Sequence, residues 1–192
     1  MQDHFALLRW LEPLALPEAF PSPQVAQASN SLGVELCQAS LGNRAGNLRQ
    51  AIACYEAALR VYTERDFPQQ WAMTQTNLGL VWSDLPTGDR AANLRQAIAH
   101  CEAALRVSTE QDFPRDWAGT QNNLGNAWQS LPAGDRAANL RQAIACCEAA
   151  LRVYTERDFP QDWAMTQNNL GNAWQSLPTG DRAANLSRAT IC

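Results

Sequence analysis

Lysine is absent from this chain, and the features of several protein classes are absent with it. All 15 basic residues are arginines, they are interspersed with 19 acidic residues, and the formal net charge is -4. A nucleic-acid-binding face needs a concentrated positive stripe, so we expect no nucleic-acid partner. No apolar run approaches the roughly 18 residues of a membrane span, so we expect no membrane partner either.

The sequence motifs of common enzymes are also lacking. There is no P-loop, no H-E-x-x-H and no G-x-S-x-G. The neighbours His100 and Cys101 could suggest a catalytic pair, but adjacent residues on a helix point about 100° apart and do not share a proton easily. We therefore predict a non-enzymatic protein with no catalytic residues and no cofactor.

Neither an export signal nor a disulfide framework is predicted. The apolar residues of 1–20 are interrupted by Arg9, Glu12 and Glu18, and no small-residue cleavage site follows them. The 6 cysteines contain no C-x-x-C pair. Reduced thiols in a cytoplasm are the expected state of such a chain.

One phrase recurs along the chain at a fixed interval. The segment TQNNLGNAWQSLP occupies 120–132 and 166–178, and a variant of it, TQTNLGLVWSDLP, occupies 74–86, so that each step is 46 residues. Self-similarity at such a period is typical of a solenoid, in which each unit buries its apolar face by stacking on its neighbours. No strand-like alternation lies between the copies, so the pattern predicts an all-α fold.

Each unit contains two helical patterns. The first spans 117–131, and the second spans about 90–110, with Asp89 placed to cap its first turn. Glu102 and Arg106 are spaced as an i,i+4 ion pair on the solvent face of the second helix. The apolar stripes are Trp117, Leu124, Ala127, Trp128 and Leu131 on the first helix, and Leu94, Ala97, Ile98, Cys101, Ala104 and Leu105 on the second.

The helix pair resembles the tetratricopeptide repeat (TPR), which places Leu-Gly and an aromatic residue on its first helix and small residues on its second. The matching residues are Leu124, Gly125 and Trp128, then Ala97, Cys101 and Ala104. The resemblance covers 24–192 and implies a right-handed superhelix of antiparallel helix pairs. The long repeat resembles those of kinesin light chains and those that flank caspase-like (CHAT) domains in bacterial multidomain proteins.

The array is predicted to hold about three and a half repeats. Their boundaries are about 23–68, 69–114, 115–160 and 161–192, with the last repeat incomplete, and 1–22 is predicted to form a capping helix. An unfinished edge at 163–192 could pair two chains into a homodimer. The chain could also be the sensor portion of a larger bacterial signalling protein.

Two repeated sets invite a functional interpretation but favour a structural one. Cys54, His100, Cys146 and Cys192 share one repeat position, yet successive repeats are at least a helix diameter, about 10 Å, apart. We therefore predict buried thiols and no metal site. Six tryptophans, spaced by 11 residues within each repeat, are predicted to pack in the core: Trp71, Trp82, Trp117, Trp128, Trp163 and Trp174.

The asparagines and glutamines around Leu-Gly are the candidate binding residues. In TPR proteins these positions face the concave groove, and an amide can match both the N–H and the C=O of a bound peptide. The candidates are Asn77, Asn122, Asn123, Asn126 and Gln129, with Asn168, Asn169, Asn172 and Gln175. They predict a scaffold that holds a peptide or partner segment in its groove. The alternative is that these amides hydrogen-bond neighbouring helices within the array, and the sequence leaves both possibilities open.

Overall fold

The computed structural model describes residues 22–39, 42–178, 185 and 187. Those ranges are helical and contain no strand, which confirms the all-α prediction. The capping segment predicted at 1–22 lies outside the described residues apart from Ser22, as does most of 179–192. The helices are α2 (Pro23–Gln38), α3 (Arg44–Leu59), α4 (Pro68–Asp84), α5 (Arg90–Ala104), α6 (Pro114–Ser130), α7 (Arg136–Ala150) and α8 (Pro160–Ser176).

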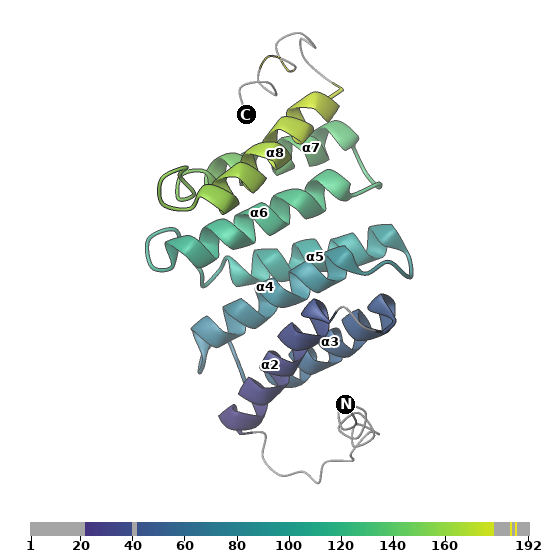
Figure 1. Ribbon diagram of the computed structural model, residues 1–192, viewed down its shortest axis with the longest axis vertical. Helices are drawn as coiled ribbons and strands as arrows, with labels where there is room; N and C mark the ends of the chain where they lie inside the picture. Colours follow the sequence, from purple (N-terminus) through teal and green to yellow (C-terminus); the bar gives the residue numbers. More distant parts are fainter. Residues whose placement is uncertain (1–21, 40–41, 179–184, 186, 188–192) are drawn as a thin grey trace.

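Successive helices pack as pairs that follow one another along the molecule (Figure 1). The pairs α2–α3, α4–α5 and α6–α7 make the most extensive contacts, and each pair contacts the next through its second helix. The first helices also touch in series, α2 with α4, α4 with α6, and α6 with α8. The second helices α3, α5 and α7 do not approach one another within 8 Å between Cα atoms.

The turn between paired helices has the same chemistry in successive repeats. Gly88 has a φ of +87°, which favours glycine, and the Asn93 side-chain amide donates to the carbonyl of Thr87 at 2.9 Å. The Asp89 carboxylate then accepts from the backbone N–H groups of Ala91 and Ala92 at 2.8 and 3.2 Å. The cap predicted at Asp89 is confirmed, and it sets where α5 begins.

The second helix is shorter than the sequence predicts. It ends at Ala104 instead of continuing to 110, because the following N–H groups tighten to i−3 partners, as Arg106 does to Ala103 at 3.1 Å. The Thr109 hydroxyl then accepts from the backbone N–H of Asp112 at 3.0 Å, which gives the chain a local alternative to the helix.

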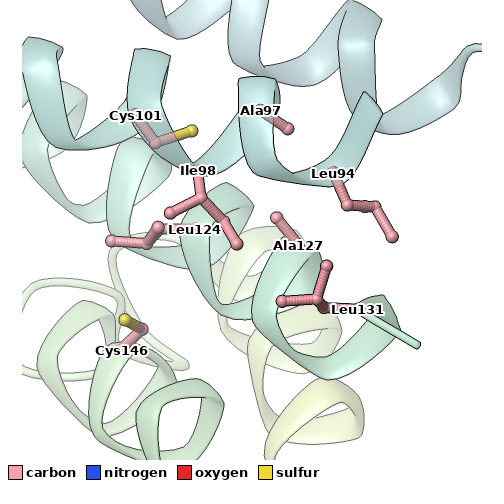
Figure 2. Close-up of a cluster of buried hydrophobic side chains, with 8 residues drawn as sticks. All are labelled: Leu94, Ala97, Ile98, Cys101, Leu124, Ala127, Leu131 and Cys146. Carbon is pink, nitrogen blue, oxygen red and sulfur yellow. The ribbon is translucent and has the colours of Figure 1, made fainter. Parts of the chain in front are cut away.

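The core lies between helices that the stripes bring together (Figure 2). The cluster in Figure 2 joins α5, α6 and α7. Its residues are Leu94, Ala97, Ile98 and Cys101 of α5, Leu124 and Ala127 of α6, Leu131 directly after α6, and Cys146 of α7. All of these are at most 7% exposed, so most of both predicted stripes is buried, whereas Trp128 and Leu105 of the same stripes are half-buried. Gly125 permits the close approach of α7, since an added Cβ would lie 3.2 Å from the Ala143 carbonyl oxygen.

The repeated tryptophans contribute to the core to different degrees. Trp71 and Trp117 are buried, each 8% exposed, whereas the other four are half-buried and pack against the same apolar clusters. The predicted core role is therefore confirmed for all six tryptophans, although part of the side chain remains accessible to solvent in four of them: Trp82, Trp128, Trp163 and Trp174.

The predicted pairing of Arg106 with Glu102 is wrong. Arg106 instead binds Glu64 of the preceding repeat with two hydrogen bonds, at 3.1 and 2.8 Å, and its guanidinium lies 5.2 Å from the centre of the Trp71 ring. α5 ends at Ala104, so Arg106 lies beyond the regular helix that the i,i+4 spacing assumes. Ion pairs therefore join neighbouring repeats here.

Candidate functional site, the face of the first helices

Equivalent residues of α4, α6 and α8 form one stripe that runs across the first helices; we call it the first-helix face. The residues are spaced i, i+4, i+7, which places them on one side of each helix. They are Met73, Asn77 and Leu80 on α4, Gly119, Asn123 and Asn126 on α6, and Met165, Asn169 and Asn172 on α8. Met73, Leu80 and Met165 are 48%, 44% and 48% exposed, so large apolar side chains reach solvent beside the amides.

Most of the predicted binding residues lie at the surface. Those that are partly exposed are Asn77, Asn123, Asn126, Gln129 and Asn169, and those that are fully exposed are Asn168, Asn172 and Gln175. Asn122 differs from all of them, because it is only 2% exposed. The nine candidates therefore divide into a surface set and a buried residue.

Polar side chains also join each first helix to the next. The contacts are Thr74 to Asn30 at 3.2 Å, Thr76 to Thr120 at 2.9 Å, and Asn169 to Asn122 at 3.0 Å. In the last of these the Asn169 amide nitrogen donates to the Asn122 oxygen. Asn122 and Asn169 therefore hydrogen-bond within the protein, whereas the amides of Asn77, Asn123 and Asn126 have no hydrogen-bond partner in the described part of the chain.

A cavity of about 330 Å³ opens on the first-helix face between the second and third repeats. Two predicted residues, Asn77 and Asn123, line it from α4 and α6. Met73, Ser108, Gly119 and Tyr154 line it as well. Ser108 is 5% exposed, so its small hydroxyl side chain lies deep in the molecule.

Charged residues also line the cavity. Asp116 and Asp162, from the first turns of α6 and α8, line it together with Arg115. Burial raises the pKa of Tyr154 to about 12; Asp162 and Asp116 add to the rise, and Arg115 opposes it. The Tyr154 hydroxyl is therefore neutral at physiological pH and donates to the Arg115 carbonyl oxygen at 3.4 Å.

Sequence reasoning did not find the residues around this cavity other than Asn77 and Asn123. The repeats themselves contain the signal, because Ser108 stands where the neighbouring repeats have Tyr62 and Tyr154, and Gly119 stands where they have Met73 and Met165. A comparison of the repeats position by position would have marked both residues as departures from the pattern.

The Cys/His set at one repeat position is structural in its contacts. His100 Nδ1 lies 2.6 Å from the Gln75 side-chain oxygen, and burial lowers the pKa of His100. Burial raises the pKa of Cys54 and raises that of Cys146 to about 11, so both are protonated thiols at neutral pH. Cys192 lies outside the described residues.

Two kinds of feature are absent from the described residues. No group of three or more His, Cys, Asp or Glu side chains is placed there to hold one metal ion. None of the described helices combines the length and the apolar composition needed to cross a membrane.

No protein-family description, curated protein or solved structure matches this chain. The first-helix face and its cavity are therefore the basis on which a function is assigned.

Proposed function

We propose that this protein is a non-enzymatic scaffold of the TPR type that binds an extended or helical segment of a protein partner across its first-helix face. In this proposal the helix pairs form a solenoid whose inner side is lined by α2, α4, α6 and α8. The contacts among the helices support such a curvature, because the first helices touch in series while α3, α5 and α7 stay apart. A stack that is closer on one side bends towards that side.

The observation that carries the proposal is the combination of unpaired amides and exposed apolar side chains on one face. Asn77 lies between Met73 and Leu80 along the same side of α4. Neutral amides can bind the backbone of a peptide, and exposed methionines adapt to apolar side chains of different shapes. A preformed helical surface also loses little entropy on binding.

The internal hydrogen bond narrows the predicted binding set. Asn122 is buried and Asn169 donates to it, so in the proposal these two residues position α6 against α8. The amides that remain available at the centre of the face are Asn77, Asn123 and Asn126. End-to-end pairing through 163–192 stays a prediction, since much of that segment lies outside the described residues.

A peptide-display selection against the purified protein tests this proposal. Peptides enriched by the wild-type protein should bind about thirty-fold more weakly to the double variant Asn77→Ala with Asn123→Ala, because each lost amide removes a hydrogen bond worth about 1 kcal/mol and every ~1.4 kcal/mol is ten-fold in Kd. The matched control is Gln96→Ala with Gln142→Ala, since both glutamines are exposed on second helices. Selected peptides that bind the Asn77/Asn123 variant as tightly as the control would refute the proposed surface.

A further inference from the structure

The cavity on the first-helix face lies where one repeat has lost a large side chain. In the first and third repeats, the Tyr62 and Tyr154 hydroxyls reach the carbonyl oxygens of Pro23 and Arg115, each at 3.4 Å. These carbonyls belong to the start of the first helix of the same repeat. Ser108 is the equivalent residue of the second repeat, and its side chain is too short to cross this space. The missing phenol ring leaves room beside Met73.

A second truncation forms the opposite wall. Gly119 occupies the position that Met73 and Met165 hold in the neighbouring repeats. An added Cβ at Gly119 would lie 3.1 Å from the Tyr154 hydroxyl oxygen, so glycine lets this hydroxyl approach α6. Serine at 108 and glycine at 119 thus both contribute to the same cavity.

The cavity is also more acidic than the equivalent positions elsewhere in the array. Asp116 and Asp162 correspond to Gln24 and Gln70 in the first two repeats. Neither carboxylate forms an ion pair with any residue that the structure describes. Among the residues that the structure describes, Arg115 is the one cation in the lining, and its guanidinium lies 5.7 Å from the centre of the Phe159 ring. The lining therefore holds two carboxylates against one guanidinium.

We infer that this cavity receives an arginine side chain of the partner segment that the first-helix face binds, with Asp116 and Asp162 as its charged acceptors. This inference rests on the proposed function. A guanidinium has five N–H donors in a rigid plane, and carboxylate, amide and hydroxyl oxygens surround this space. Lysine, a compact point charge with three donors, would use fewer of these acceptors.

The first arm of the test uses a single amino-acid probe. N-acetylarginine amide is titrated into ¹⁵N-labelled protein, and the signals of the Gly119 backbone and of the Asn77 and Asn123 side chains are followed. We expect saturable shifts with this probe, and binding about ten-fold weaker or more with N-acetylcitrulline amide, which has a similar shape without the charge. Equal binding of the two probes, or no binding of the arginine probe, would overturn the inference.

Variants separate the cavity from the fold. Asp116→Asn with Asp162→Asn keeps the shape of the lining and removes its charge, so binding of the arginine probe should fall about ten-fold or more. Ser108→Tyr should fill the cavity with a residue that the array already accommodates at 62 and 154. If a correctly folded Ser108→Tyr protein still shifts the same three signals with the same affinity, the site lies elsewhere.

The second arm distinguishes failure of this inference from failure of the scaffold function. Display-selected peptides are compared with copies in which each arginine is replaced by citrulline. Peptides that need the first-helix face but do not distinguish arginine from citrulline would leave the scaffold standing and overturn the arginine site. Binding of the arginine probe without any selected peptide would refute the scaffold and retain the acidic cavity.

Discussion

Replacing Asn122 by alanine should destabilise the protein, whereas the same change at Asn123 should not. The two residues are adjacent in the interior of α6, so both substitutions gain the same helix propensity and this gain cancels in the comparison. Asn122 is 2% exposed and its side chain accepts from Asn169 at 3.0 Å, whereas Asn123 is partly exposed and its side chain makes no hydrogen bond in the described structure.

The size of the difference follows from burial. Loss of one partner of a buried hydrogen bond costs about 1–3 kcal/mol. Because Asn169 is partly exposed and can turn to water, we expect the lower part of this range, about 1–2 kcal/mol, between the two variants. For a chain of this length that corresponds to a difference of about 2–8 °C in Tm.

Urea unfolding followed by far-UV circular dichroism measures the difference directly. Asn122→Thr serves as a control, because it places a hydroxyl opposite Thr166 as Thr76 stands opposite Thr120 in the preceding repeat. This variant should recover most of the stability that Asn122→Ala loses. Equal stability of Asn122→Ala and Asn123→Ala would show that the contact between α6 and α8 contributes nothing, and the division of the asparagines into two roles would then be wrong.

Three further substitutions test the packing, titration and capping described above. Gly79→Ala should lower the free energy of unfolding by about 1–2 kcal/mol, even after its gain in helix propensity, because the new Cβ would lie 2.6 Å from Cys101 Sγ. Urea unfolding should show a smaller loss of stability when the same change is made in a Cys101→Ala background. An equal loss in the two backgrounds would exclude that clash as the cause. His100, which is hydrogen-bonded to Gln75, has a lowered pKa in the folded protein, so its contribution to stability is present above pH 6.5 and is lost as the pH falls below that value. The His100→Cys variant should therefore lose less stability than the wild type between about pH 8 and pH 5. Parallel curves of unfolding free energy against pH for the two proteins would contradict this. Asp135→Ala should lower the free energy of unfolding by about 1 kcal/mol, because it removes the carboxylate that caps α7. Asp135→Asn should retain most of the stability, since an asparagine side chain can also cap a helix. Indistinguishable melting curves for the two variants would argue against the cap.

The local chemistry of each repeat was readable from the sequence, because helices depend on residues close together along the chain. The spacing of Leu94, Ala97, Ile98 and Cys101 predicted a buried face, and Asp89 predicted the start of a helix. The end of that helix could not be placed as well, because helix ends fray and a nearby threonine hydroxyl can bond the backbone in place of the helix.

Part of the proposed binding surface was also readable from the sequence. The side chains of seven of the nine predicted residues lie at the surface and make no hydrogen bond in the described structure. A 46-residue repeat carries each position to the equivalent place on the next helix, which is why the sequence could group them. Asn122 was misjudged as a surface residue. Two neighbours on a helix differ by about 100° in direction, and the rotation of α6 against α8 decides which of them is covered.

Sequence alone determined the helix pairs, their caps and the apolar stripes by which they stack. The tertiary structure decided that Arg106 binds Glu64 of the preceding repeat, that Asn122 is buried beside Asn169, and that Ser108 and Gly119 line one cavity. Each of these three arrangements brings together residues from different helices or turns, and the spacing of residues within one helix does not predict them. Their geometry depends on how one helix pair is rotated against the next, and that rotation is set by the packing of the whole array.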